Sequence, residues 1–394
     1  MSKQESIVIV SAARTPMGGM QGVFDSVAAT ELGAVAISAA IERAAIANDS
    51  LDEVYFGNVV SAGLKQAPAR QAALRAGLSN SIPCTTVSKV CGSGMKAVMI
   101  ARDQIAAGNA DAIIAGGMEN MSATPYLIPK ARGGLRLGHG ELKDSLFMDG
   151  LEEAETGGLM GGFGQATADE YGIGREAMDA YAIRSLQRAQ QAQTEGWMAD
   201  EIAAVTVKTR KGEVLVDEDE QPGKANADKI PKLKPAFKKD GTVTAANASS
   251  MSDGAAALLI MRESVAEANG CQPLARLVAQ ASHAQAPSEF CLAPVGALRK
   301  VLEKASWSSD EVDLYEINEA FAVVSMLAID HLGLDDGKVN VNGGACALGH
   351  PLGASGARIL VTLLYALQRL NKTRGVASLC IGGGEATAVA IEML

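Results

Sequence analysis

The sequence predicts an α/β fold around a mainly parallel sheet, organised in two or three domains. Short apolar segments typical of buried strands alternate with longer segments of helical periodicity, which is the pattern of βα units. One such unit occurs twice, once near residue 92 and again near residue 353. A length of 394 residues exceeds what one core usually supports, so more than one domain is expected.

The first 119 residues supply most of this alternation. Residues 6–12, SIVIVSA, are typical of a buried strand, and residues 30–47 follow a helical pattern that Thr30 is expected to cap. Strands are expected at 6–12, 53–60, 86–90 and 111–117, and helices at 30–47, 68–76 and 95–107.

The region from about 120 to 250 differs in character and is interpreted as an insertion. It is rich in glycine and loops, and only residues 175–193 have a clear helical pattern. Residues 130–143 have a net charge of +3 and residues 224–239 a net charge of +5. Such stretches usually form a solvated face, but in a chain with a formal net charge of −10 they could instead attract a phosphate-bearing ligand.

The last third repeats the opening pattern. Strands are expected at 275–282 and 312–317, with a helix at 295–304 between them. Residues 92–119 and 353–385 are similar to each other, because each has a glycine-rich turn, an apolar helix, and a strand that ends in glycines and a glutamate. Two copies that meet on buried apolar helices would bring both turns to one cleft.

Composition and charge exclude several classes of function. The chain is 48% hydrophobic and 20% charged, and its net charge of −10 argues against nucleic acid as a partner, since phosphates need a basic face. No apolar run approaches the ~20 residues of a membrane span. The first residues, MSKQESIVIV, have no signal-peptide pattern. No membrane association is expected, and the cytoplasm is the expected location.

The cysteines are expected to be reduced thiols. The six cysteines form no C-x-x-C pair and no cluster with the four histidines, so no metal site is expected. Cys91, in TVSKVCGSGMKA, lies between a strand-like run and a helix-like segment. The free N–H groups and the positive end of the helix dipole would favour a thiolate there, which suits a nucleophile. The alternative is a small buried side chain, which is the commoner role of cysteine.

Three segments in the last third place polar groups on otherwise apolar loops. Asn318 opens NEAFA, His350 lies in the glycine-rich segment NGGACALGHPLGASGAR, and Cys380 begins CIGGG. Glycines allow successive N–H groups to point at one anion, as in an oxyanion hole. Singly, each residue has an ordinary interpretation: a hydrogen-bonded loop histidine, a turn-forming asparagine and a buried strand cysteine. Glu319 is expected to be a structural hydrogen-bonding partner rather than a base.

Taken in order, CGSG, NEAF, GHPLGASG and CIGGG resemble the motifs of the thiolase family, of the acetyl-CoA acetyltransferase kind, over essentially the whole chain. The segments SAARTP and KLKPAFKKDGTVTAANAS fit the same family. The resemblance implies two similar βαβαβαββ halves in a five-layered α-β-α-β-α arrangement, with an inserted loop domain that binds coenzyme A. The implied domains are residues 1–119 with 251–270 (N-terminal half), 120–250 (loop domain) and 271–394 (C-terminal half).

The resemblance implies ping-pong acyl transfer without a permanently bound cofactor. Cys91 would be the nucleophile that becomes acylated, His350 the base that activates it, and Cys380 the second acid/base, acting at the α-carbon. Asn318 would hold a water that forms one oxyanion hole with His350. The N–H groups of Cys91 and Gly382 would form the other.

The substrates implied by the resemblance are coenzyme A thioesters. Six residues match family positions along the pantetheine tunnel: Leu151, Met160, Phe237, Ala248, Ser249 and Phe321. Phe290 is also expected at the substrate site, where it replaces a methionine that commonly flanks the acyl group. The basic stretches would meet the nucleotide phosphates. A homo-oligomer, either a dimer or a dimer of dimers, is also implied, because residues 132–143 resemble the loop that joins dimers in tetrameric members.

The implied reaction is the reversible condensation of two acetyl-CoA molecules to acetoacetyl-CoA and CoA. Departures from the usual pattern at Leu159, Phe290, residues 161–166 and residues 250–252 lie near the acyl chain or the pantetheine, and they leave chain length and branching open. Phe290 in place of a flexible methionine favours a short substrate. The alternative is a 3-oxoacyl-CoA thiolase for longer chains in fatty-acid β-oxidation, and a more distant one is a non-catalytic acyl-CoA binding module.

Overall fold

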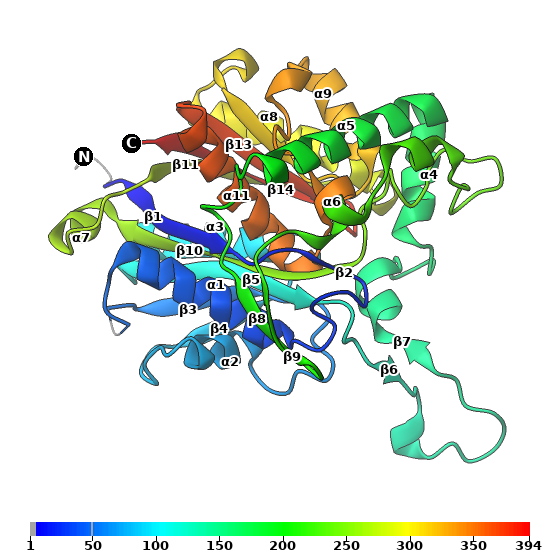
Figure 1. Ribbon diagram of the computed structural model, residues 1–394, viewed down its shortest axis with the longest axis horizontal. Coiled ribbons are helices and arrows are strands. Elements are labelled where there is room, and N and C mark those ends of the chain that lie inside the picture. The colour runs from blue at the N-terminus through cyan, green and yellow to red at the C-terminus, as the bar shows by residue number, and fades with distance from the viewer. Residues whose placement is uncertain (1–4, 49) are drawn as a thin grey trace.

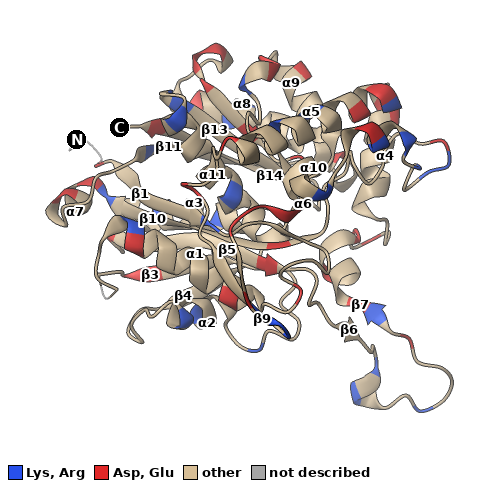
Figure 2. Cartoon of the chain, viewed as in Figure 1, with Lys and Arg blue, Asp and Glu red and all other residues tan. Residues whose placement is uncertain are grey.

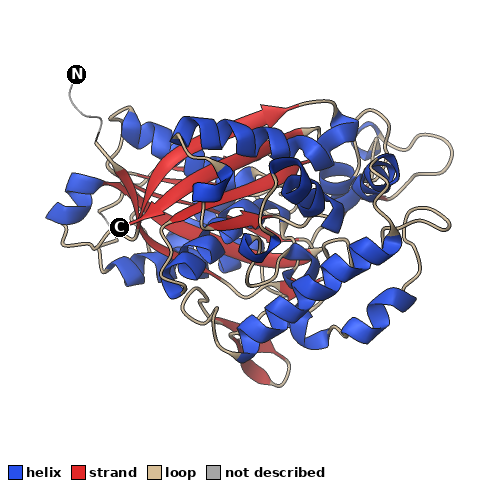
Figure 3. Cartoon of the chain, turned by 90° about the horizontal axis from the view of Figure 1, so that it is seen from above, coloured by secondary structure: helices blue, strands red, loops and turns tan. Residues whose placement is uncertain are grey.

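The computed structural model describes residues 5–48 and 50–394 and stacks five layers of secondary structure (Figure 1). From one outer face to the other, the layers are helices α1 and α2, a first sheet, helices α3 and α11, a second sheet, and helices α8 and α9. Seen from above, helices flank the strands on both sides (Figure 3). The five-layered α/β fold implied by the sequence is therefore confirmed.

Each sheet is built from one half of the chain. The strands of the first sheet are β1 (Ile7–Arg14), β3 (Glu53–Gly57), β4 (Cys84–Val87), β5 (Ala112–Asn120) and β10 (Ser252–Arg262). The strands of the second are β11 (Ala275–Ala284), β12 (Leu314–Ile317), β13 (Arg374–Ile381) and β14 (Glu385–Met393). The helical layers contain α1 (Ala29–Ala44), α2 (Pro68–Arg75), α3 (Ser93–Ala106), α8 (Ala293–Ala305), α9 (Ala322–Leu332) and α11 (Leu352–Arg369).

The two sheets are continuous at one edge, where Val8 and Ile9 of β1 pair with Arg276 and Ala275 of β11. The strand order is β4-β3-β5-β10-β1 in the first sheet and β11-β14-β13-β12 in the second. The prediction of a mainly parallel sheet is wrong, because among the described strands of these sheets only β3–β4, β3–β5 and β12–β13 pair in parallel. The reason is that β10 and β14 each return antiparallel into the interior of a sheet.

The two halves have similar folds, but one strand of the first half is replaced by an isolated bridge in the second half. In the first half, β4 pairs with β3 from Cys84 to Val87. The matching place in the second half holds an isolated bridge between Tyr315 and Val339. The chain continues from this bridge into the short helix α10 (Ala345–Leu348) and then the loop that carries His350. The second half therefore lacks a regular strand at this position, close to the loop that carries His350.

Helix α1 begins one residue earlier than the sequence predicts, and its expected cap is wrong. Ala28 is the N-cap residue, and Thr30 lies inside the first turn. The Thr30 hydroxyl instead accepts a hydrogen bond of 2.5 Å from Arg75 of α2. A threonine near a helix start therefore joins two helices here rather than capping one.

The insertion contains more regular structure than its sequence predicts. Helix α5 (Arg175–Thr194) matches the prediction, but the structure also has the helices α4 (Met160–Glu170) and α6 (Glu220–Lys224). It further contains the strand pair β6–β7 and a pair formed by β8 (Val205–Thr209) and β9 (Gly212–Val216). Because glycine disfavours helices, the glycine-containing sequence of α4 does not predict a helix. At Gly161 a Cβ atom would lie 2.0 Å from the Phe237 ring, so packing against that ring requires glycine. The loop between β6 (Tyr126–Leu127) and β7 (Lys143–Asp144) projects from the body of the molecule (Figure 1).

A buried ionic cluster attaches the insertion to the first sheet. Arg14, at the end of β1, is completely buried and donates hydrogen bonds to Glu201 at 2.6 Å and to both carboxylate oxygens of Asp219 at 2.7 and 2.9 Å. Its charge is thereby fully paired, which is the condition under which a buried guanidinium is tolerated. No helix in the described part of the chain is both long and apolar enough to cross a membrane.

The central helices α3 and α11 touch almost backbone to backbone. A Cβ atom at Gly94 of α3 would lie 2.9 Å from the Ala357 nitrogen, and one at Gly356 of α11 would lie 2.5 Å from the Met95 nitrogen. Real Cβ atoms do not approach backbone atoms so closely, so any larger residue forces the helices apart.

Gly356→Ala should therefore destabilise the protein by about 1–3 kcal/mol, because the added methyl group overpacks a rigid contact. Urea unfolding measures this change in the free energy of unfolding. The matched control is Gly162→Ala on α4, where a Cβ atom would meet nothing within 4 Å. That variant should be neutral or more stable by up to about 1 kcal/mol, since alanine is the better helix former. Equal effects of the two substitutions would contradict the close contact.

Candidate active site

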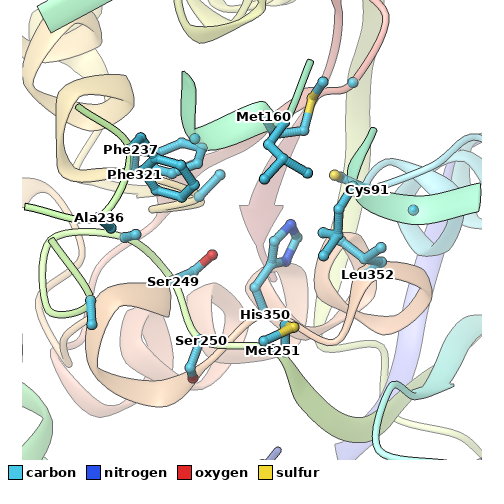
Figure 4. Close-up of a pocket in the computed structure, with 18 of the residues that line it drawn as sticks. Cys91, Met160, Ala236, Phe237, Ser249, Ser250, Met251, Phe321, His350 and Leu352 are labelled. Carbon is cyan, nitrogen blue, oxygen red and sulfur yellow. The ribbon is translucent and has the colours of Figure 1, made fainter. Parts of the chain in front are cut away.

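A cavity of about 470 Å³ opens where the insertion meets both halves of the chain (Figure 4). All seven residues expected along the substrate path line it: Leu151, Met160, Phe237, Ala248, Ser249, Phe290 and Phe321. Of the five residues expected to carry chemistry, Cys91, His350 and Gly382 also line it. Asn318 and Cys380 do not line it, and each is only 1% exposed. Residues from distant parts of the sequence thus gather at one place.

Cys91 lies on a strained turn between β4 and α3. Val90 has a φ of +45°, which is an outlier for a β-branched residue. The Ser93 hydroxyl holds the turn by accepting from the Lys89 N–H at 2.9 Å and donating to the Val90 carbonyl at 2.7 Å. Gly92 is the N-cap residue of α3, so Cys91 precedes a helix N-terminus, as the sequence predicts. Strain of this kind gathers at functional positions.

Burial decides the protonation state of Cys91. It raises the pKa of the thiol to about 11, although the backbone N–H groups of Gly382 and of Cys91 itself are directed at the sulfur and lower the pKa. The expectation that the helix terminus favours a thiolate is therefore wrong, because desolvation outweighs the dipole. The two N–H groups converge on the Cys91 sulfur, so an acyl oxygen carried on this sulfur would lie near both donors.

Ser355 fixes the tautomer of His350. The Nδ1 atom of His350 lies 2.5 Å from the Ser355 Oγ, and the Ser355 hydroxyl donates to the Pro351 carbonyl at 2.9 Å. A hydroxyl has one hydrogen, so Ser355 accepts at the other contact and Nδ1 carries the proton. Nε2 is then a free base, and it is buried without a hydrogen-bond partner among the described residues. Figure 4 shows the imidazole pointing into the cavity beside Cys91.

The environment of His350 keeps the ring neutral. Burial, and next the Arg358 guanidinium, lower the pKa of His350 to about 3. With the Cys91 thiol also neutral, the two groups form an uncharged pair at neutral pH. This pair differs from a thiolate–imidazolium ion pair, in which the cysteine is already ionised before a substrate binds.

Asn318 and Glu319 are neighbours with different surroundings. Asn318 Nδ2 lies 3.5 Å from His350 Nδ1, and Asn318 Oδ1 accepts from Arg358 at 3.3 Å. Glu319 is fully buried and accepts four hydrogen bonds of 2.7–3.1 Å, from Tyr181, Ser185, Asn340 and the Cys346 N–H. Glu319 is therefore a structural hydrogen-bonding partner, as the sequence predicts.

Cys380 lies near the end of β13, deep beside the cavity. Burial, and then the sulfurs of Cys291 and Cys91, raise the pKa of Cys380 well above the usual value of a thiol. Cys91 and Cys380 are thus close enough for a charge on one to disfavour a charge on the other. At most one of these two sulfurs is expected to be ionised at a time.

Aromatic side chains and the end of the insertion complete the cavity. Phe290 and Phe321 pack edge to face, with ring centroids 6.3 Å apart and an angle of 74° between the rings. The Ser249 N–H donates to the Ala320 carbonyl at 2.9 Å, and the His350 N–H donates to the Ser250 carbonyl at 3.1 Å. The last residues of the insertion are therefore bound to two loops of the second half.

The two basic stretches lie in different places. Residues 130–143 are on the loop that projects between β6 and β7 and do not line the cavity (Figure 2). In the second stretch, Lys229 lines a smaller cavity of about 230 Å³. Gln221, Ala245 and Ser250 line both cavities. Only the second stretch thus lies near the residues expected to bind substrate.

Sequence reasoning missed several residues that shape the site. Ser355 lies in the GASG motif, but nothing in a single sequence indicates its bond to His350. Phe147 and Gly150 line the cavity from a π-helical segment, Phe147–Leu151, in a region predicted to be loop. Leu352 also lines it, and its place two residues after His350 is the one available signal.

Comparisons with known proteins agree over the full length. Residues 7–264 match the family described as "Thiolase, N-terminal domain", and residues 271–393 match "Thiolase, C-terminal domain". An acetyl-CoA acetyltransferase of Escherichia coli K12 is 51% identical over 393 residues, covering 99% of this chain and 100% of the relative. A probable acetyl-CoA acetyltransferase of Dictyostelium discoideum is 48% identical over 391 residues, covering 99% and 94%. The crystal structure of the Bacillus anthracis acetyl-CoA acetyltransferase is similar with a TM-score of 0.97 and 40% identity, covering 100% of both chains.

Because the Cys91 thiol is neutral, its alkylation by iodoacetamide should accelerate from pH 6 to pH 10. The thiolate fraction of a group far below its pKa rises about tenfold per pH unit. Mass spectrometry of the peptide that contains Cys91 measures the rate, and a short cysteine peptide, which levels off above about pH 9, is the control. A constant rate between pH 5 and pH 8 would instead indicate a preformed ion pair with His350.

Proposed function

The chain belongs to the thiolase family, and we propose that it is an acetyl-CoA C-acetyltransferase, which joins two acetyl-CoA molecules reversibly into acetoacetyl-CoA and free CoA. The observation that carries this proposal is the meeting of the Cys91 thiol, the His350 imidazole and two converging N–H groups at one cavity. Relatives of the stated name that match nearly the whole chain support it. Coenzyme A thioesters are then the substrates, and no cofactor needs to stay bound.

In the first half-reaction, Cys91 becomes acetylated. His350 Nε2 takes the thiol proton while the sulfur attacks the thioester carbonyl and a carbon–sulfur bond forms. The N–H groups of Cys91 and Gly382 hold the oxyanion. The bond to coenzyme A then breaks, and its thiolate takes the proton of the Cys380 thiol, which leaves a Cys380 thiolate and a protonated His350. The buried, unprotonated Nε2 supports this role for His350.

In the second half-reaction, a carbon–carbon bond forms. Cys380 takes a proton from the α-carbon of the second acetyl-CoA, and a water held by Asn318 and His350 stabilises the enolate. The enolate attacks the acetyl carbonyl, the bond to Cys91 breaks, and the Cys91 thiolate takes back its proton from the His350 imidazolium, so both cysteines end as neutral thiols. This order is supported because an acetylated Cys91 is neutral, so no charge on its sulfur disfavours the Cys380 thiolate.

Two alternatives differ in measurable ways. A 3-oxoacyl-CoA thiolase of fatty-acid β-oxidation would accept longer chains, but the Phe290–Phe321 pair at the cavity supports a short acyl group. A non-catalytic acyl-CoA binding module would bind CoA esters without turnover. The reactive constellation around Cys91 is unnecessary for that role.

We also propose a cytoplasmic homo-oligomer, a dimer or a dimer of dimers. The loop between β6 and β7 exposes Leu137 completely and Leu142 by 67%, and a second copy of the chain would cover such side chains. All six cysteines, which lie within the described residues, are free thiols, which supports a reducing compartment.

The roles of the two cysteines can be separated by substitution. Cys91→Ala should abolish acetyl-enzyme formation, whereas Cys380→Ser should leave Cys91 able to be acetylated and slow condensation by about 100-fold or more. Mass spectrometry of the acetylated peptide and a condensation assay measure the two steps. Cys84→Ala, outside the cavity, is the matched control and should leave both unchanged. Labelling at another residue in Cys91→Ala, or equal loss of both steps in Cys380→Ser, would contradict these roles.

Chain-length specificity tests the identity of the substrate. Thiolysis of 3-oxoacyl-CoA substrates from four to sixteen carbons, followed by loss of enolate absorbance, should give activity only on acetoacetyl-CoA. Phe290→Ala should raise the ratio of kcat/KM for the six-carbon substrate to kcat/KM for the four-carbon substrate about tenfold, because space for one or two methylenes opens. Phe163→Ala, a phenylalanine outside the cavity lining, should not change this ratio. Activity that rises with chain length would favour the β-oxidation alternative, and no activity at all the binding module.

A further inference from the structure

Arg358 is a buried cation that the proposed reaction steps do not use. It lies on α11, is 0% exposed, and is one of the two arginines among the largest fully buried side chains. The other, Arg14, uses all three guanidinium nitrogens in hydrogen bonds to carboxylates. Arg358 makes one hydrogen bond, to Asn318 Oδ1, and its Nε and Nη1 atoms have no hydrogen-bond partner among the described residues. A stability role alone would not explain so poorly paired a charge, since apolar residues often replace buried ion pairs without loss.

The acidic neighbour of Arg358 does not explain why a positively charged residue is buried at this position either. Glu316 Oε2 lies 3.6 Å from Arg358 Nη1, beyond hydrogen-bond distance, and Glu316 Oε1 has no partner within the part of the chain that the structure describes. Burial raises the pKa of Glu316 to about 8, even though the guanidinium lowers it. The carboxyl group is therefore mostly protonated at neutral pH. Among the residues that the structure describes, the one hydrogen bond of Arg358 is therefore that to Asn318 Oδ1, at 3.3 Å.

The contact with the Arg358 guanidinium determines the orientation of the Asn318 side-chain amide. A guanidinium only donates hydrogen bonds, so the amide atom that faces Arg358 must be the oxygen. The NH₂ group of Asn318 must then face the other way, where its nitrogen lies 3.5 Å from His350 Nδ1. His350 cannot fix the amide in this orientation, because its Nδ1 hydrogen is already donated to Ser355.

We infer that Arg358 is a positioning residue that holds the Asn318 amide with its NH₂ group directed toward the His350 imidazole, as the proposed water-holding role requires. Without this donor, the amide can rotate and present its carbonyl oxygen where a hydrogen-bond donor is needed. A carbonyl there would no longer donate a hydrogen bond to the water that is proposed to stabilise the enolate oxygen, but would accept one from it. Arg358 thus acts on the condensation step through Asn318 and touches no substrate atom. The inference rests on the proposed function, since it assigns this amide to the enolate step.

The test compares Arg358→Met, Asn318→Ala and the double variant. Arg358→Met should acetylate Cys91 at least as fast as the wild type, because loss of the guanidinium leaves His350 a stronger base. The variant should lose kcat for condensation by about 100-fold, with KM within about twofold, because a transition-state contact is lost. In the Asn318→Ala background, adding Arg358→Met should lower kcat for condensation by less than a further factor of about three, because the two residues act as one unit. Losses that multiply, or acetylation that falls together with condensation, would overturn the inference.

Two further variants keep the test decisive. Arg358→Lys retains a donor without an acceptor and should keep condensation within about tenfold of wild type, so it replaces Arg358→Met if that variant does not fold. A loss in Arg358→Lys as large as in Asn318→Ala would contradict the donor role. Arg369→Met, on the same helix but outside the cavity lining, is the matched control and should keep wild-type kcat. If the wild-type chain turned over no 3-oxoacyl-CoA, the proposed function itself would fail, and this inference with it.

Discussion

The contact between α3 and α11 is the constraint on which the rest of the structure depends. Glycines at this contact let the two backbones approach to a distance that excludes side chains, so the N-termini of both helices reach the same place. Cys91 precedes one helix and His350 the other. The two halves of the chain therefore build one cavity because small residues line the surface between them. The outer layers add the hydrophobic burial that keeps this contact closed.

The reacting groups of this site are shielded from solvent, and this burial sets their chemistry. Burial makes both the Cys91 thiol and the His350 imidazole neutral, so proton transfer between them would create two charges in a medium that solvates neither. In the proposed reaction, the negative charge does not rest on sulfur but moves to the substrate oxygen, which meets N–H groups already in place. Deprotonation is thereby linked to attack, and an idle enzyme holds little reactive thiolate.

The sequence was sufficient for the elements and motifs that local pattern controls. The apolar run of β1 and the helical periodicity of α5 predict those elements, and the four motifs, three of them glycine-rich, predict residues that line the cavity or lie behind its wall. Other features depend on partners far away in the chain. The direction of β10, the helix α4 and the bond from Ser355 to His350 are decided by tertiary packing, which a single sequence does not encode locally. The roles assigned to the five chemical residues remain predictions.

The position of β10 between β1 and β5 has a consequence for synthesis on the ribosome. Ile7 pairs with Arg262 and Ala112 pairs with Met261, so β1 and β5 are synthesised long before β10, the strand with which both of them pair. Until then, the nascent chain carries two open strand edges with unpaired N–H and carbonyl groups, which readily pair with other chains. Closure of the first half over so long a stretch is also slow. The growing chain is therefore most vulnerable to aggregation while the insertion is being translated, and a chaperone that shields strand edges is most useful during that interval.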